Sequence, residues 1–437
     1  MPDTEPVTTH PLRPRIANTR VRTSLLLLCL SAAACAAPPR MIQEPRLPTC
    51  RGIVDAASAP VDVDVRWFSP ASPSDRRTHA EWCGTVGPLV IKPRPRANRP
   101  SSPPDAPVAI VSWNTHVGGA DLLAFVRDLR GGRWSEGRPA GQFVLLLQEV
   151  FRRGADVPAP VGASPPIPDA IRPGARSPGR VDIVDVAERT GLALFYAPSM
   201  RNGESGGAHD GEDRGNAILS TLPLDDFRVI ELPFERQRRV AVAASVALPG
   251  GGDAGPLRVA SAHLDALGAP RRLVVLSPVA RRRQVRGLVA ALPPEEPAVL
   301  GADLNTWVSG REGALTDLRR AFPDTPAARG STYGSLRLDY LFFRLARGWR
   351  AAWSVADRAY GSDHRPVVSW LQCFSRASRD CTQSARMSLT LDSALPSVSA
   401  SAVRSVCLRA PRRWASLQAA TEGGLRPRCL RCRWRVC

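Results

Sequence analysis

The sequence predicts a mixed α/β fold in which two β-sheets pack against each other within one domain. Short apolar runs bounded by Gly, Pro, Asn or Asp recur throughout residues 105–372. Such runs are typical of strands that are buried on both faces. Segments with helical periodicity lie between them, and the region is long enough to enclose a large core.

Apolar runs predict a series of strands along this region. Residues 108–114 form an apolar run that ends on Asn114, and residues 143–150 form a second run that carries Glu149 near its end. The first of these runs is also rich in β-branched residues, which favour strands. Further strands are predicted at residues 192–196, 217–220, 240–248, 257–263, 298–302, 338–343 and 367–371.

Three segments have the 3.6-residue periodicity of helices, and two long stretches have the composition of loops. The helices are predicted at residues 121–129, 183–190 and 271–292, the last with a face covered by Arg. Residues 154–180 and 202–214 are rich in Gly or Pro and are predicted as loops.

The first 36 residues have the pattern of an export signal. Basic residues precede an apolar run at residues 24–35, which is too short to span a bilayer as a helix. Small residues before Cys35 resemble a bacterial lipoprotein signal, in which that Cys becomes the lipidated terminus; plain cleavage near residues 34–36 is the alternative. We therefore expect an exported protein, either secreted, periplasmic or anchored to a membrane through Cys35.

Residues 37–104 are predicted to be a Pro-rich N-terminal segment and linker. Residues 61–68 alternate like a strand, and an apolar run follows at residues 86–91, which would suit a small disulfide-tied appendage. Residues 93–107 have the composition of a linker.

The ten cysteines fit an exported protein, because export permits disulfides. Cys50 with Cys83, and Cys373 with Cys381, are the natural pairs since each pair flanks a short segment, although spacing alone does not prove connectivity.

Residues 373–437 lack periodicity and are predicted to be a disordered tail rich in Arg and Cys. Cys429 and Cys432 have a spacing that zinc sites use, but no His or second matched pair accompanies them.

The formal net charge of +19 first suggests a nucleic-acid or acidic partner. Residues 105–372, however, carry 33 basic and 29 acidic side chains, a net charge of only +4. Most of the excess lies outside the region of the predicted chemistry, so the charge is weak support for a nucleic-acid enzyme.

Polar side chains recur where the predicted strands end or begin. A single Asn or Asp in such a place is usually a turn or helix cap, whereas a carboxylate after four apolar residues needs a cation or partner to offset its desolvation. Six clusters in one order at one sheet edge point to a common site. They are Asn114, Gln148-Glu149, His263 with Asp265, Asp303 with Asn305, Asp339, and Asp363-His364.

Together these clusters resemble the endonuclease/exonuclease/phosphatase superfamily, over residues 106–371. The motifs are short, but their joint order is specific. They are Trp-Asn114, Gln-Glu149, Gly215-Asn-Ala-Ile-Leu-Ser220, Ser-Ala-His263-Leu, Gly-Ala-Asp303-Leu-Asn305, Leu-Asp339-Tyr and Ser-Asp363-His364-Arg-Pro-Val. The resemblance implies a four-layer α/β/β/α sandwich with a divalent-metal site at one edge of its two sheets.

The resemblance also implies a metal site. Glu149 would be the main ligand of Mg²⁺, a hard cation that prefers carboxylate oxygens, and Mn²⁺ is the alternative ion. Asn114 and Asp363 would complete or extend the ligand shell.

The catalytic roles implied are those of phosphoester hydrolysis, which needs an oriented water and stabilised phosphate oxygens. Asp303 would orient and deprotonate the water, and Asn305 would donate its amide to a phosphate oxygen. His263 would donate to the phosphate or the leaving oxygen. His364 would contact the phosphate or act as the base, with Asp339 holding its other ring nitrogen and raising its pKa. The sequence leaves open which of Asp303 and His364 is the base.

Other polar residues are weaker candidates. Asn216 and Asp265 are weighed evenly between a site role and a capping role. The remaining histidines match no motif and are expected to be ordinary surface residues; they are His10, His79, His116 and His209.

The substrate stays open among several phosphoesters, because the family shares a chemistry and not a substrate. A nuclease would use Arg-rich loops to track a phosphate backbone, and a solvated charged face is the alternative for these side chains. They are Arg201, Arg214, Arg236, Arg238 and Arg239.

A second reading is a sphingomyelinase or phospholipase C-type enzyme, whose branch the run Gln148-Glu-Val-Phe151 resembles, although no exposed aromatic hairpin is evident. A small-molecule or inositide phosphatase is a third hypothesis. A non-catalytic binding module predicts the loss of at least one site residue, and all of them are present.

Overall fold

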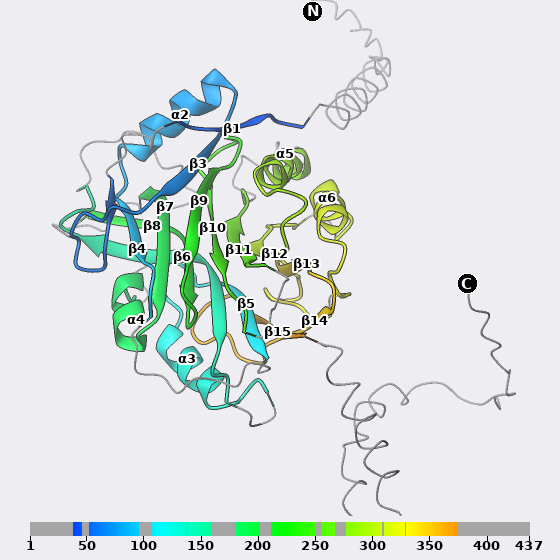
Figure 1. The fold of residues 1–437 in the computed structure, drawn as a ribbon. Helices are drawn as coiled ribbons and strands as arrows, with labels where there is room; N and C mark the ends of the chain where they lie inside the picture. Colours follow the sequence, from blue (N-terminus) through cyan, green and yellow to red (C-terminus); the bar gives the residue numbers. More distant parts are fainter. Residues whose placement is uncertain are drawn as a thin grey trace, which may run out of the picture. The chain divides into compact units, whose positions relative to one another are not determined.

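Two β-sheets lie face to face in the computed structural model (Figure 1). The structure describes residues 38–45, 52–95, 107–135, 137, 139–158, 180–201, 211–249, 255–266, 277–307, 310–327 and 329–373. The first sheet has the order β1 (Met41–Gln43), β3 (Val65–Pro70), β9 (Asp225–Glu231), β10 (Val240–Val246), β11 (Leu257–His263), β12 (Ala298–Asp303) and β13 (Asp339–Arg344). The second has the order β14 (Trp349–Val355), β15 (Val367–Cys373), β5 (Val108–Asn114), β6 (Phe143–Gly154), β8 (Gly211–Ser220), β7 (Ala193–Arg201), β4 (Leu89–Lys92) and β2 (Ile53–Val54).

Helices cover the outer faces of both sheets, which confirms the predicted two-sheet α/β sandwich. Apolar side chains of α3 (Leu122–Arg130) and α4 (Ile183–Thr190) pack on the second sheet. Those of α5 (Ser277–Ala290) and α6 (Gly313–Ala321) pack on the first. A third apolar core fills the space between the sheets. The central strands are therefore covered on both faces, which explains why all seven residues of β5 are buried and why its sequence is continuously apolar.

The two sheets lie close together at Gly301 in the middle of β12. A Cβ atom at this position would lie 2.8 Å from the Cβ of Leu146 and 2.9 Å from the Cβ of Ser112, both on the opposite sheet. Glycine is required here because any side chain would push the sheets apart. Asp303 follows two residues later, so this contact sets the spacing of the sheets just below the candidate site.

The N-terminal segment does not form a separate appendage. Between residues 38 and 95, strands β1 and β3 extend the first sheet, and β2 and β4 extend the second. Helix α2 (Pro73–Cys83) begins at the N-cap Ser72, with Pro73 in its first turn. The Pro-rich composition obscured these elements because each strand is short and lies at or near a sheet edge, where Pro is tolerated.

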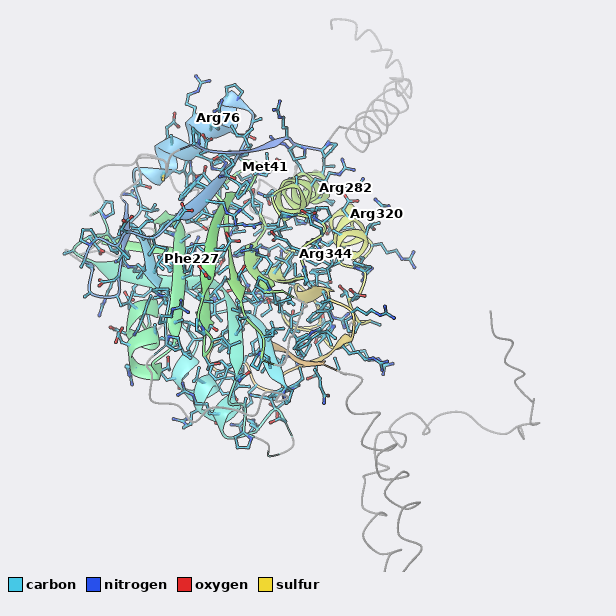
Figure 2. All side chains as sticks on the ribbon, in the orientation of Figure 1. Met41, Arg76, Phe227, Arg282, Arg320 and Arg344 are labelled. Carbon is cyan, nitrogen blue, oxygen red and sulfur yellow. The ribbon has the colours of Figure 1, made fainter. Side chains whose placement is uncertain are left out.

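The outer helices carry many Arg side chains, and these divide into two kinds. Arg282 and Arg320 lie on the outer side of α5 and α6 (Figure 2), and Arg320 has a side chain that is 77% exposed. In contrast, Arg281 is fully buried and makes two 2.8 Å hydrogen bonds to Glu312, which precedes α6. The predicted Arg-covered face therefore includes arginines whose ion pairs join α5 to the region of α6, since Arg282 and Arg286 also pair with Asp317 of α6.

Several predictions concern residues outside the described ranges. These are the export signal at residues 1–36, the tail from residue 374 onward, and the pairing of Cys83 and Cys373 with Cys50 and Cys381. They stay predictions. Within the described residues, no helix is both long and apolar enough to cross a membrane.

Candidate active site

The carboxyl ends of two pairs of parallel strands bring the predicted polar residues to one edge of the sandwich. On the second sheet, Asn114 of β5 is aligned with Gln148 of β6. On the first sheet, His263 of β11 is aligned with Asp303 of β12, which is in turn aligned with Asp339 of β13. A hydrogen bond of 2.9 Å from the Asn114 amide to the Asp303 carboxylate connects the two sheets at this point.

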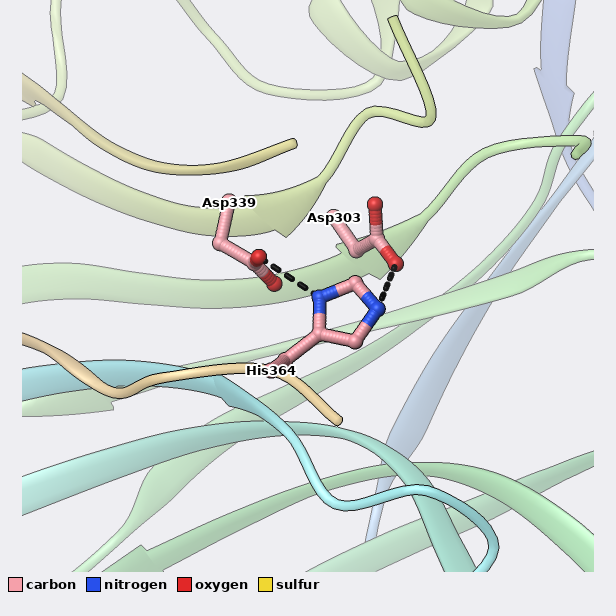
Figure 3. A group of neighbouring side chains, drawn as sticks. All are labelled: Asp303, Asp339 and His364. Carbon is pink, nitrogen blue, oxygen red and sulfur yellow. Dashed lines mark hydrogen bonds and ion pairs between the residues drawn. The ribbon is translucent and has the colours of Figure 1, made fainter. Parts of the chain in front are cut away.

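His364 lies between two buried carboxylates (Figure 3). Its Nδ1 lies 2.7 Å from Asp339 Oδ2, and its Nε2 lies 4.0 Å from Asp303 Oδ2. All three side chains are at most 6% exposed. The other oxygen of Asp339, Oδ1, is buried without a hydrogen-bond partner among the described residues.

The loop before β15 is anchored so that His364 points into this edge. Ser362 donates a 2.7 Å hydrogen bond to the Asn114 carbonyl and accepts one of 3.0 Å from the backbone of His364. Trp113 donates from its indole to the His364 carbonyl at 2.9 Å. Gly361, with φ of +87°, supplies the left-handed turn that starts the loop.

The buried charges of this group raise the pKa values of both His364 and Asp303. Burial opposes a positive charge on His364, but the attraction of Asp339 and its hydrogen bond, together with Asp303 and Asp363, raise the pKa to about 10. Burial and the repulsion of Asp339 raise the pKa of Asp303 to about 7, against the attraction of His364. At neutral pH, His364 is therefore an imidazolium, and Asp303 can take up or release a proton.

His263 forms the second part of the site. Its Nε2 lies 2.8 Å from the amide nitrogen of Asn305, which also donates to the Leu264 carbonyl at 3.0 Å. Because the amide nitrogen is a donor, Nε2 is the acceptor and the ring proton is assigned to Nδ1, 3.7 Å from Glu149 Oε1. Burial and nearby cations hold the pKa of His263 well below its usual value, so the ring is neutral.

Glu149 and Asn305 are turned into the site by unusual backbone conformations. Glu149 has φ of +50° within a β-bulge between Leu147 and Val150, and Asn305 has φ of +49°. Left-handed conformations are uncommon for residues other than glycine and are concentrated at functional sites. The bulge leaves the Glu149 side chain 21% exposed, whereas Leu147 and Val150 on either side are buried.

Asp363 lies at the outer margin and has a partner that the sequence did not predict. Its carboxylate is 3.1 Å from Nδ1 of His116 and 3.9 Å from Nε2 of His364. The hydrogen bond with Asp363 raises the pKa of His116 despite partial burial. His116 was expected to be an ordinary surface residue; its side chain is indeed 46% exposed, but the loop after Asn114 also turns it toward Asp363. The one available signal was its position two residues after Asn114.

The weaker candidates have structural partners. Asn216 donates a 2.5 Å hydrogen bond to the Val240 carbonyl and so links the two sheets. Asp265 pairs with Arg239 at 3.2 Å and accepts a hydrogen bond from Gln284 on α5. Neither side chain is a turn or helix cap.

The arginines proposed to track a phosphate backbone differ in position. Arg238 is 1% exposed and binds Glu231 and two backbone carbonyls, so it cannot reach a ligand. Arg239 is held by Asp265. Arg214 is buried close to Glu149, whose charge acts on its guanidinium. The description of Arg238 as a backbone-tracking residue is therefore wrong.

A separate cavity of about 470 Å³ lies at the other end of the sheets. Its lining includes Arg258 at the start of β11 and Pro297 before β12. The candidate site lies at the carboxyl ends of the same two strands, so this cavity is not part of it.

Residues 111–364 match the Endonuclease/Exonuclease/phosphatase family. A comparison with curated proteins found no match.

Solved structures with a similar fold come from bacteria and from humans. An endonuclease/exonuclease/phosphatase from Beutenbergia cavernae DSM 12333 is 20% identical, with 61% of this chain and 72% of that chain covered and a TM-score of 0.42. The human Nocturnin catalytic domain with bound sulfate is 15% identical, with 64% and 100% covered and a TM-score of 0.40. Sphingomyelinase C from Streptomyces griseocarneus is 16% identical, with 61% and 99% covered and a TM-score of 0.35. The family match covers more than half of the sequence, and this chain therefore belongs to the endonuclease/exonuclease/phosphatase family.

Proposed function

We propose that this chain is a Mg²⁺-dependent phosphodiesterase that acts on nucleic acid. The observation that carries the proposal is the pairing of a cationic His364 with a proton-accepting Asp303 at one buried edge. A phosphodiester needs both functions at once, because its oxygens gain negative charge while the attacking water loses a proton.

The donor set on the Glu149 side suits a hard divalent cation. Glu149 presents a carboxylate that is turned out of its strand and partly exposed, and the residues proposed to complete the ligand shell are Asn114 and Asp363. Ligand atoms of Asp303, Asp339 and His364 also lie within 4.8 Å of one another. A cation there would be repelled by the His364 imidazolium and would compete with it for Asp339. We therefore favour a metal site beside Glu149. Bound Mg²⁺ or Mn²⁺ would neutralise charge on the phosphate oxygens.

The side chains divide the remaining work. Asp303, whose pKa lies near neutrality, accepts a proton from the attacking water. The water oxygen then bonds to phosphorus while the bond from phosphorus to the leaving oxygen breaks. His364 is already protonated, so it stabilises a phosphate oxygen rather than acting as the base. Asp339 fixes the ring by binding Nδ1. Neutral His263 supplies a further hydrogen-bond donor at Nδ1, and the Asn305 amide, whose two N–H groups bind His263 Nε2 and the Leu264 carbonyl, holds this ring in place.

The proposal is tested with the purified full chain and bis(p-nitrophenyl) phosphate or plasmid DNA. We expect hydrolysis with Mg²⁺ or Mn²⁺, and its loss in EDTA with recovery when the metal is added back. Glu149→Gln should lower kcat/KM by roughly 10²-fold or more, because a metal ligand loses its charge.

Glu188→Gln is the matched control, since Glu188 lies on α4 with a side chain that is 37% exposed and pairs with Lys92. It should leave the rate unchanged. Activity in EDTA, or a Glu149→Gln variant as active as the Glu188→Gln control, would exclude the assignment of the metal site.

A phospholipase C-type activity on sphingomyelin is the second candidate. The sequence around Glu149 and Phe151 resembles that branch, and one structure of similar fold is a sphingomyelinase C. Within the described ranges, however, Leu336 is the one large apolar side chain that is well exposed, which offers little surface for a bilayer. Parallel assays on DNA, RNA, sphingomyelin and inositol phosphates separate these activities from an inositide phosphatase, and a chain inactive on all of them would be a binding module.

We also propose that the chain is exported, and that Cys35 is lipidated and anchors it to a membrane. The support is the basic, apolar and small-residue pattern of residues 1–36. Expression of the full gene in a bacterial host, followed by fractionation and mass spectrometry of the mature N-terminus, tests this. A Cys35→Ser variant should move from the membrane to the soluble exported fraction, and an uncleaved N-terminus would contradict export.

A further inference from the structure

Two buried arginines, Arg214 and Arg239, and the partly buried Arg180 lie close enough for their charges to interact, and the charge of Glu149 also acts on Arg214. Arg214 is 8% exposed and Arg239 is 6% exposed. Arg180 has a side chain that is 14% exposed. Burial lowers the pKa of the Arg214 guanidinium, the charge of Glu149 opposes this effect, and Arg239 and Arg180 add to it. Positive charges that are buried near one another destabilise a fold unless anions neutralise them.

The partners of these arginines differ. Arg239 is neutralised by Asp265 at 3.2 Å, and Arg180 lies 3.7 Å from Glu212. For Arg214, the single hydrogen-bond acceptor among the described residues is the sulfur of Met200, at 3.4 Å. A thioether is a weak acceptor, and a guanidinium carries five N–H donors. Among the residues that the structure describes, Arg214 thus has no anion in hydrogen-bond contact, although its guanidinium is buried.

The sheet register directs Arg214 toward the site. Arg214 on β8 lies directly opposite Phe151 on β6, two residues beyond Glu149. Residues directly opposite each other project from the same face of a sheet. The guanidinium of Arg180 lies 5.6 Å above the Phe151 ring, so both cations are on this face. The charge of Arg214 also contributes to the lowered pKa of His263, so its electrostatic effect extends into the site.

We propose that Arg214, supported by Arg180, binds a second phosphate of the substrate, next to the phosphodiester that is cleaved. A planar guanidinium can make two parallel hydrogen bonds to a phosphate and is the side chain best suited to this contact. Such a subsite deepens the proposed function and rests on it. It defines the substrate class as phosphodiesters with a neighbouring phosphate, whether in a nucleic-acid strand or in a phosphorylated nucleotide.

The same cations disfavour a phosphocholine lipid. Its headgroup carries a quaternary ammonium beside the scissile phosphate, and a positive group that approached Arg214 and Arg180 would be repelled. Sphingomyelin should therefore be a poor substrate even where its phosphodiester reaches Glu149 and His364.

Two chromogenic substrates test the subsite. Thymidine 5′-(p-nitrophenyl phosphate) has the scissile phosphate alone, and its 3′-phosphorylated form carries a second one. The full chain should prefer the second substrate by about tenfold or more in kcat/KM, mainly through KM, as one charge-assisted contact provides. In Arg214→Met the ratio of the two kcat/KM values should approach one, and Arg214→Lys should keep part of the preference. Arg320→Met, at an exposed arginine on α6, should keep all of it.

A binding measurement separates this proposal from the proposed activity. By calorimetry, thymidine 3′,5′-bisphosphate should bind more tightly than thymidine 5′-phosphate, and Arg214→Met should remove the difference. If neither chromogenic substrate is hydrolysed but this difference is present, the proposed activity fails and the subsite stands. Equal binding of the two nucleotides, or an unchanged preference in Arg214→Met, overturns the subsite. A short oligonucleotide and the bisphosphate compared as inhibitors show which source of the second phosphate binds better.

Discussion

The hydrogen bond between His364 and Asp339 determines the chemistry of the imidazole. Asp339 binds Nδ1 at 2.7 Å, so Nε2 is the nitrogen that faces Asp303 and the substrate. Because Asp339 is completely buried, its charge is poorly screened and keeps His364 protonated. The same charge repels Asp303 and makes it a better base. The charge of Asp339 therefore acts on two residues: it keeps His364 protonated and favours proton uptake by Asp303.

We predict that His364→Ala abolishes turnover without unfolding the protein. The side chain supplies a cation and a hydrogen bond to the transition state, so kcat should fall by roughly 10²- to 10⁴-fold. Steady-state kinetics with bis(p-nitrophenyl) phosphate measure the loss, and circular dichroism with thermal melting checks the fold. Asp339→Asn should lower kcat less, because the ring stays in place while its pKa falls. Full turnover in His364→Ala would return this residue to a structural role.

The sequence predicted which polar residues gather at the edge, and it missed those that depend on loop conformation. Asn114, Glu149 and Asp303 could be found because each follows an apolar run. His116 could not, since its approach to Asp363 requires φ of +51° in a loop with no glycine at that position. Arg214, which we propose to bind a phosphate, could not be separated from Arg238 either, because burial and pairing are tertiary properties.

At the scale of elements, strands with continuous apolar sequences were predicted almost to the residue. Strands β5 and β11 match their predictions, and α4 does as well. Strand β14 was missed because it lies at a sheet edge and alternates between partly and fully exposed positions, without a strong apolar signal. Helix α6, which starts at Gly313 without a side-chain N-cap, was missed, and α2 was missed because it lies in a Pro-rich context.

The prediction that His79 on helix α2 lies on the surface is also wrong. It is 1% exposed, and its ring packs edge-on against Phe234 with centroids 5.8 Å apart. On α2, the buried residues Asp75, His79 and Trp82 repeat at helical spacing. The helix therefore docks through a face that includes a titratable side chain.

We predict that this histidine makes the fold sensitive to mild acid. Burial lowers the pKa of His79 below its ordinary value of 6.5, and Arg238 adds to this effect against Glu231 and Asp75. The folded state thus favours the neutral ring, and its contribution to stability is complete above about pH 6.5. As the pH falls below this value, the unfolded chain binds a proton that the folded chain excludes, so stability decreases by up to about 1.4 kcal/mol per pH unit.

Urea unfolding at a series of pH values measures the effect against His79→Gln, which does not titrate. The difference in unfolding free energy between the two proteins should shrink from about pH 7.5 to about pH 5.5. Arg76→Gln, at an exposed position of the same helix, should follow the wild type throughout. A constant difference across this range would show that His79 titrates equally in both states.

At the scale of the whole molecule, the site exists because two sheets meet at a fixed distance. Asn114 belongs to the second sheet and Asp303 to the first, and the 2.9 Å hydrogen bond between them crosses the interface. The sequence could predict that there are two sheets, but not their spacing, which depends on side chains far apart in the chain. At Gly301 an added side chain would collide with the opposite sheet and so change this spacing.

We therefore predict that Gly301→Ala is destabilising and impairs catalysis. A Cβ atom would lie within 2.9 Å of Ser112 and Leu146, so the sheets must separate or the strands must shift, at a cost of about 1–3 kcal/mol. The shift would pull Asp303 away from Asn114, and kcat should fall more than KM rises, because the catalytic groups lose alignment. Gly310→Ala is the matched control, since no atom lies within 4 Å of the added Cβ among the described residues. Urea midpoints and steady-state kinetics for both variants decide the question, and a Gly301→Ala protein as stable and active as the control would mean that the sheets adjust at no cost.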